Sequence, residues 1–403
     1  MRGRGALHPA AKGRLSCKIG GMTAQLRPHR LGIAPMTRRG VLLGTLALAA
    51  APRAQAGGAV RLATYNAALS RRGPGLLLRD ILSGSDPQVE AAADVVTAAA
   101  ADVLLLTGID WDHDLRALDA FAARLAERGL DYPHRFARRP NSGWQTGRDM
   151  VGDGRVGTAD DAQGYGAFSG VKGMALLSRL PVEAAAARDF SQFLWRDLPG
   201  ARLPQRDGRP YPSDAVFTQQ RLSTTGHWDV PVQLPSGAWL HVLAWYATPP
   251  VFGGPEDRNR LRNHDETRFW TLLLDGALPM PPPAGPFALM GDANLDPNDG
   301  DGLHAAIREL IAHPSVQDPL PRSLGAGMAA PADREGDPAL HTVQWDGPRQ
   351  PGNLRVDYVL PAAALTVLDA GVLWPADPDP LAEAVVAASR HRLVWVDVAD
   401  PGA

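Results

Sequence analysis

The sequence predicts an α/β fold in which two packed sheets are covered by helices. Short apolar runs that suit buried strands alternate with helical patterns from about residue 60 to the C-terminus, and strands and helices in this order favour packed mixed layers. The sequence has no internal repeat, and strands resume after the Pro- and Gly-rich stretches 276–286 and 320–338. We therefore expect one large domain over residues 57–403 rather than two small ones.

The predicted elements follow from runs of apolar residues and from their spacing. Strands are expected where short runs rich in Val, Leu and other apolar residues occur, at 60–65, 102–106, 173–178, 228–233, 239–245, 287–290, 355–360, 369–374 and 393–398. Helices are expected where longer segments follow a helical pattern, at 88–100, 114–128, 256–275 and 302–312. The segment 256–275 is the longest and most charged of the predicted helices.

Residues 1–56 have the features of an export leader. A twin arginine at 38–39 precedes an apolar stretch of roughly 12 residues, which is too short to span a bilayer. The small residues of Ala54-Gln55-Ala56 then form a signal-peptidase pattern. We expect a twin-arginine (Tat) signal peptide and a periplasmic or secreted protein, with translation beginning at either Met1 or Met36. The alternative is a cytoplasmic protein with a basic leader.

The charge of residues 57–403 favours a small ligand. Ten of the 41 Lys and Arg residues lie in the leader, which has no Asp or Glu, so the remaining chain carries a net charge of −12. Long nucleic acids bind to clustered basic side chains, and an acidic surface repels them. The single cysteine, Cys17, also lies in the leader, so the domain has neither a disulfide nor thiol chemistry.

Polar residues follow several of the predicted buried strands. The first strand ends at Asn66, the second runs into Thr107-Gly108-Ile109-Asp110, and the strand 287–290 runs into Gly291-Asp292-Ala293-Asn294. Arg355-Val356-Asp357-Tyr358 and Ser389-Arg390-His391 come later in the chain. Polar groups at the ends of buried strands converge on a rim, where binding sites form. Each motif alone also suits a turn or a strand cap, but the ordered set indicates a site.

These motifs resemble the ordered signature of the endonuclease/exonuclease/phosphatase superfamily. The resemblance extends over about residues 60–398, and it rests on Tyr-Asn at 65–66, Gly-Asp-x-Asn at 291–294, Arg-Val-Asp-Tyr at 355–358 and Ser-x-His at 389–391. It implies a four-layer α/β/β/α sandwich of two packed mixed sheets. It also implies metal-assisted hydrolysis of a phosphate ester. The segments 193–195, 248–252 and 255–259 are similar to those of an exported bacterial subgroup.

The resemblance implies a catalytic role for five residues. His391 matches the histidine beside the scissile phosphate, and Asp357 matches the carboxylate that fixes its tautomer and favours the imidazolium. Asp292 matches the residue that orients or deprotonates the attacking water. Asn294 matches a neutral donor to the phosphoryl oxygens, and Asn66 matches a donor near the metal and the phosphate.

Three positions depart from the pattern of the family. Gly108 stands where the family places a metal-ligating glutamate, and Arg390 stands where it places an aspartate associated with the metal. Tyr246 stands where the strand normally delivers a second histidine. The first two changes make the site more positive, and a guanidinium repels a divalent cation nearby. We therefore expect weak binding of the Mg²⁺ or Mn²⁺ that the family implies.

Two functions stay open at this point. In the first, the chain hydrolyses a phosphate mono- or diester, Arg390 offers a bidentate fork to the phosphate, and Tyr246 is a further substrate contact. Asp110 would lie on the same strand face as Gly108, where it pairs with Arg390 or acts as a displaced metal ligand. In the second, the pocket binds a phosphorylated ligand or partner without catalysis. The residues indicate neither a particular substrate nor an oligomeric state.

Two further segments carry weaker signals. Arg258 and Arg262 on the predicted helix 256–275 are candidates for binding the substrate phosphate, although the acidic residues among them favour a surface rich in ion pairs. The segment 149–161 resembles a calcium loop in part, but Val151 occupies a ligand position, which favours a glycine loop without calcium.

Overall fold

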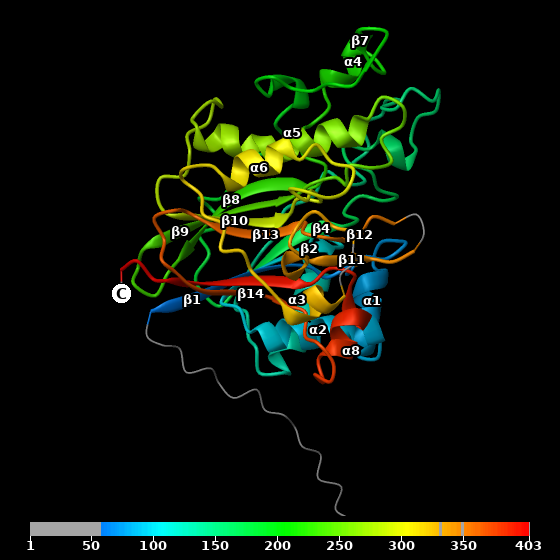
Figure 1. The fold of residues 1–403 in the computed structure, drawn as a ribbon. Coiled ribbons are helices and arrows are strands. Elements are labelled where there is room, and N and C mark those ends of the chain that lie inside the picture. Colours follow the sequence, from blue (N-terminus) through cyan, green and yellow to red (C-terminus); the bar gives the residue numbers. More distant parts are fainter. Residues whose placement is uncertain (1–57, 330–332, 348–349, 403) are drawn as a thin grey trace, which may run out of the picture. The chain divides into compact units, whose positions relative to one another are not determined.

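The computed structural model describes residues 58–329, 333–347 and 350–402. The predicted leader and its cleavage site lie outside these residues. Two sheets pack face to face, and helices cover the outer face of each sheet (Figure 1). The four-layer α/β/β/α sandwich and its mixed sheets are thereby confirmed. None of the described helices combines the length and the apolar character that a membrane crossing requires.

The first sheet contains six strands and is mixed. Its central strand β1 (Ala59–Asn66) pairs in parallel with β2 (Val103–Ile109) and antiparallel with β15 (Leu393–Ala399). The remaining strands extend the order to β14-β15-β1-β2-β4-β3, with β3 at His134–Phe136, β4 at Gly173–Ser178 and β14 at Val367–Leu373. The first and last strands of the domain are therefore neighbours at the centre of one sheet.

Alternation along β1 connects this sheet to two cores. Val60 and Leu62 point into the core shared with the second sheet, whereas Ala63 and Tyr65 point into the core beneath the helices, as the two-residue period of a strand requires. The helices over this outer face are α1 (Leu76–Ser83), α2 (Pro87–Ala99), α3 (Arg116–Ala126) and α8 (Ala382–Ala388) (Figure 1).

The second sheet contains five strands in the order β13-β10-β9-β8-β5. The strand β10 (Phe287–Asp292) pairs in parallel with β9 (Trp239–Tyr246) and antiparallel with β13 (Asp357–Pro361). The remaining strands are β8 (Gly226–Gln233) and the edge strand β5 (Arg188–Asp189), and α5 (Arg258–Leu274) and α6 (Ala305–Ile311) cover this sheet. The smaller elements are β6 (Gln205–Arg206), β7 (Arg209–Pro210), α4 (Asp214–Phe217), α7 (Leu324–Met328), β11 (Val343–Trp345) and β12 (Gly352–Leu354).

The prediction that the charged helix exposes a surface rich in ion pairs is wrong. Arg262, Asp265 and Glu266 of α5 are buried, and residues of the segment between β5 and β8 form hydrogen bonds with all three. Trp195 donates its indole N–H to Asp265 Oδ2 at 2.7 Å, and Glu266 accepts hydrogen bonds from the backbone N–H and the hydroxyl of Thr224. A charge pattern predicts that the charged residues of a helix lie in solvent, because it does not show which remote segments of the chain pack against that helix.

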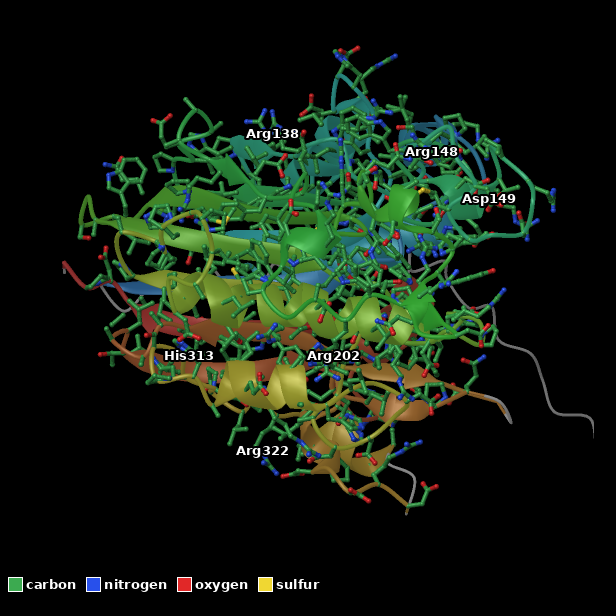
Figure 2. The ribbon with its side chains drawn as sticks, turned by 90° about the horizontal axis from the view of Figure 1, so that it is seen from above. Arg138, Arg148, Asp149, Arg202, His313 and Arg322 are labelled. Carbon is green, nitrogen blue, oxygen red and sulfur yellow. The ribbon has the colours of Figure 1, made fainter. Side chains whose placement is uncertain are left out.

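The segment predicted as a glycine loop forms one. The carboxylate of Asp149 accepts backbone N–H bonds from residues 151–154, with the N–H of Gly152 at 2.6 Å and that of Gly154 at 2.8 Å. Figure 2 shows Arg148 and Asp149 in this loop, at the periphery of the view. Among the described residues, the groups of carboxylates and imidazoles that could hold a metal ion lie elsewhere.

Candidate active site

Three neighbouring strands of the second sheet place three polar side chains in one row. Asp292, the last residue of β10, is the register partner of Asp357 on β13 and of Tyr246 on β9. Asn66 ends β1 of the other sheet, and His391 precedes β15 by two residues. The structure therefore brings together five of the residues that the sequence singled out and takes them from both sheets: Asn66, Tyr246, Asp292, Asp357 and His391.

His391 is held by Asp357. The ring Nδ1 lies 2.9 Å from Asp357 Oδ2 and 3.8 Å from Asp292 Oδ2. The hydroxyl of Thr342 donates to the same Oδ2 of Asp357 at 2.9 Å, and it accepts the N–H of Asp357 at 3.0 Å. The second carboxylate oxygen of Asp357 is buried and has no hydrogen-bond partner among the described residues. One oxygen of Asp357 thus orients the imidazole, while the other is available for a further ligand.

Asn66 joins the two sheets at this point. Its Nδ2 donates to Asp292 Oδ2 at 2.9 Å and lies 3.4 Å from the hydroxyl oxygen of Tyr246 and 3.5 Å from Nε2 of His391. Ser389 fixes both ends of this contact, because its hydroxyl donates to the carbonyl of Asn66 at 2.7 Å and accepts the N–H of His391 at 3.1 Å. The serine of the Ser-x-His motif is therefore a positioning residue.

Asn294 is positioned by a turn beside Asp292. Its backbone N–H donates to Asp292 Oδ1 at 2.8 Å, and its side chain donates to the carbonyl of Ala247 at 3.0 Å. The residue has a φ of 47°, in the left-handed region that asparagine tolerates better than most residues. The amide nitrogen of Asn294 is therefore engaged with the backbone, while its Oδ1 accepts no hydrogen bond from the described residues.

Burial and mutual repulsion set the protonation of the cluster. Burial, aided by the charge of Asp357, raises the pKa of Asp292. Burial alone would lower the pKa of His391, but the charges of Asp357 and Asp292 outweigh it and raise that pKa above its usual value. Burial and the charge of Asp292 also raise the pKa of Tyr246, so this residue stays a neutral phenol near neutral pH.

Gly108 leaves no room for a side chain. It lies at an irregularity in the pairing of β2 with β4, between Thr107 and Ile109, and has a φ of 69°. A Cβ atom at this position would overlap Oδ1 of Asn66 and lie 3.3 Å from its Cγ. Gly108 is thus part of the packing that holds Asn66 in the site.

Asp110 does not join the cluster. Its Oδ1 accepts from the hydroxyl of Ser70 at 2.5 Å and from the N–H of Lys172 at 3.1 Å, and its Oδ2 accepts the N–H of Arg71 at 2.8 Å. Burial raises the pKa of this carboxyl. The side chain therefore connects three chain segments, and the structure gives the predicted role as a metal ligand no support.

The three arginines predicted to contact substrate occupy different environments. The side chain of Arg390 is exposed and forms no hydrogen bond or ion pair with any described residue, so it does not pair with Asp110. Arg262 is buried and donates only to backbone carbonyls, with that of Leu222 at 2.8 Å. Burial lowers the pKa of Arg262 to about 9 and that of Arg258 to about 10.

Arg262 is therefore a structural residue and not a free phosphate ligand, which corrects the sequence interpretation. The sequence could not reveal this, because the carbonyls it binds come from loops far away in the chain. Arg258 has two guanidinium nitrogens that are buried without a hydrogen-bond partner among the described residues. The charges that act on it are those of Asp160 and Asp161, outside the catalytic cluster.

The cluster can hold a divalent cation, but not in the manner of the complete family pattern. Ligand atoms of Asp292, Asp357 and His391 lie within 4.8 Å of one another, and the unpartnered oxygen of Asp357 is a ligand that hard cations prefer. No carboxylate is present at position 108 or 390. The residues therefore fit a cation bound through Asp357 and Asp292, with fewer carboxylates than the resemblance implies.

The sequence matches a known protein family. The model of the endonuclease/exonuclease/phosphatase family matches residues 63–391. An endonuclease/exonuclease/phosphatase from Beutenbergia cavernae DSM 12333 is 19% identical, with 85% of this chain and 72% of that chain covered and a TM-score of 0.49. Sphingomyelinase C from Streptomyces griseocarneus is 18% identical, with 84% and 99% covered and a TM-score of 0.42.

A third solved structure is that of the human Nocturnin catalytic domain with a bound sulfate anion. It is 11% identical, with 85% of this chain and 93% of that chain covered and a TM-score of 0.44. No curated protein matches the sequence.

Proposed function

Because the chain belongs to the endonuclease/exonuclease/phosphatase family, we propose that it is an exported hydrolase of a small phosphate mono- or diester with an altered metal site. The observation that supports this proposal is the hydrogen-bonded cluster of Asn66, Asp292, Asp357 and His391 at the meeting point of the two sheets. The arrangement provides an acid, a base and a neutral donor within one site, which is what the hydrolysis of a phosphate ester requires.

Each residue has a distinct part in the proposed reaction. Asp292, once ionised, accepts the proton of the attacking water while the water oxygen bonds to phosphorus and the ester P–O bond breaks to release the alcohol. Its raised pKa makes it a better base than an ordinary carboxylate. His391 is held as an imidazolium by Asp357 and donates to the oxygens of the phosphoryl group, where negative charge develops. Asn66 donates a hydrogen bond that orients Asp292. A divalent cation bound by Asp357 and Asp292 would supply charge neutralisation and polarise a phosphoryl oxygen.

The charge and the leader support the choice of substrate and location. Residues 57–403 carry a net charge of −12, which disfavours long nucleic acids and favours a small phosphorylated compound. The twin arginine at 38–39 and the small residues at 54–56 support Tat export to the periplasm or the exterior. The second candidate function is binding of a phosphorylated ligand without hydrolysis, which the absence of a carboxylate at Gly108 and at Arg390 favours.

The first prediction concerns turnover. We expect the purified protein to hydrolyse bis(p-nitrophenyl) phosphate or p-nitrophenyl phosphate in Mn²⁺ or Mg²⁺, and D292N to lose at least about 100-fold in kcat, because Asn cannot accept the proton of water. The release of nitrophenol is measured with each cation, with Ca²⁺ and with EDTA. Absence of turnover in every condition, together with binding of inorganic phosphate in calorimetry, would favour the binding function.

The second prediction concerns the pH dependence of kcat/KM. Activity rises as Asp292 loses its proton and falls as His391 loses its own. Since both pKa values are raised, the acid limb should lie above the usual Asp value of about 3.9 and the alkaline limb above the usual His value of about 6.5. The measurement is a profile of kcat/KM from about pH 4 to about pH 10. An acid limb at the ordinary Asp value would contradict the assignment of Asp292 as the base.

A further inference from the structure

A second group of acidic and imidazole side chains lies outside the catalytic cluster. Ligand atoms of Asp296, Asp299 and His341 all lie within 4.8 Å of one another. The two aspartates belong to the turn that follows β10, and His341 lies between the short helix Pro338–Leu340 and β11. All three residues are buried, with exposed fractions of 3% for Asp296, 8% for Asp299 and 1% for His341.

His341 is the member of this group whose side chain has no hydrogen-bond partner among the described residues. Both of its ring nitrogens are buried, and neither has a hydrogen-bond partner among the described residues. A buried polar group without a hydrogen-bond partner destabilises a fold, so an imidazole with two such atoms indicates a ligand at the site. A neutral imidazole offers a ring-nitrogen lone pair to a metal ion.

The two carboxylates are fixed so that they face the imidazole. Asp296 Oδ1 accepts the N–H of Asp299 at 2.8 Å, and its Oδ2 accepts the N–H of Arg355 at 2.6 Å. Asp299 accepts the N–H of Glu335 at 3.1 Å on Oδ1 and that of Gly336 at 2.9 Å on Oδ2. Each carboxylate oxygen has a further lone pair, and hydrogen bonds of this kind orient the ligands of a metal ion.

We propose that Asp296, Asp299 and His341 bind a divalent cation of the zinc type, at a site separate from the catalytic cluster. One imidazole and two carboxylates form a ligand set that suits Zn²⁺, with a fourth position left for water. Two buried carboxylates close together repel each other, and the cation offsets that repulsion. The inference goes beyond the proposed function and does not depend on hydrolysis.

The position of the site gives the ion a structural role. Its ligands and their hydrogen bonds connect the turn after β10, the segment 335–341 and the backbone immediately before β13. The next residue along the chain, Thr342, orients the carboxylate of Asp357. The ion therefore stabilises the segment that carries one of the supports of the catalytic histidine.

The third prediction tests this site with zinc itself. The full chain is dialysed against Zn²⁺ and then against buffer, its zinc content is measured by mass spectrometry, and its Tm is measured with and without Zn²⁺. We expect H341Q to hold about one equivalent of zinc less than the unmodified protein and to lose the rise in Tm that zinc produces.

Two further variants make the test specific. D299N should behave like H341Q, and it keeps an oxygen acceptor for the loop N–H groups, so it stands in if H341Q does not fold. H313Q removes a buried histidine that follows α6 and whose Nε2 lies 3.2 Å from Asp275 Oδ1. His313 is labelled in Figure 2, and the zinc content and Tm rise of H313Q should match those of the unmodified protein. The proposal is overturned if H341Q, D299N and the unmodified protein have the same zinc content and the same rise in Tm. It is also overturned if the unmodified protein retains no zinc.

Discussion

Replacing His391 with glutamine should lower kcat by about 10²–10⁴-fold, the range in which a positioned general acid or base contributes to catalysis. Glutamine keeps a side chain of similar length that can reach Asp357, but it cannot carry the positive charge that the two neighbouring carboxylates favour on the imidazole. The loss should fall on kcat more than on KM, because the charge stabilises the transition state and not the bound substrate.

The measurement is a full kinetic comparison with the nitrophenyl esters. H313Q provides the matched control, since it removes a histidine that lies outside the cluster, and it should retain the activity of the unmodified protein. Circular dichroism verifies that H391Q is folded. An H391Q protein with unchanged kcat would remove His391 from the mechanism.

Introducing the family glutamate at Gly108 should inactivate the protein rather than improve it. The new Cβ would displace the Asn66 side chain and break its hydrogen bond to Asp292, and the backbone at this position has a φ of 69°. Left-handed backbone at a residue with a side chain costs about 1–3 kcal/mol. We expect G108E to lower the free energy of unfolding by about 2 kcal/mol or more and kcat by at least about 10²-fold.

Two variants separate the causes of this loss. G108A should show most of the effect of G108E, because the first side-chain atom already overlaps Asn66. G237A also places a Cβ on left-handed backbone, with a φ of 88°, but its Cβ meets no atom within 4 Å, so it should destabilise the fold without loss of kcat. Denaturant unfolding and steady-state kinetics give both quantities. A gain of activity in G108E would show that the backbone at 108 rearranges and that the complete family metal site can form.

The fold and the family were predictable from local patterns. Buried strands such as 103–109 and 287–292 consist of contiguous apolar residues with polar residues at their ends, and both features are visible along the chain. The resemblance to the endonuclease/exonuclease/phosphatase family is confirmed over residues 63–391. The structure also brings Asn66, Asp292 and His391 into contact, as their order along the chain predicted. Their catalytic roles and the export signal stay predictions.

The supporting residues could not be predicted, because their contacts depend on the tertiary fold. Thr342 holds Asp357 from a segment without any recognised motif, and His341 becomes notable only because its two nitrogens are buried without partners. The packing of Asn66 against Gly108 brings together residues from two different strands, so the sequence showed a missing glutamate but not the reason for the glycine. Burial of Arg262 likewise depends on loops that are remote in sequence.

The pairing of the first strand with the last has a consequence for when the protein can work. Asn66 and His391 are separated by 325 positions, and they meet only because β1 and β15 are neighbours in one sheet. Asn66 is synthesised 325 residues before His391, so a nascent or truncated polypeptide that stops before residue 391 has no complete centre. The centre is complete only after β15 has paired with β1.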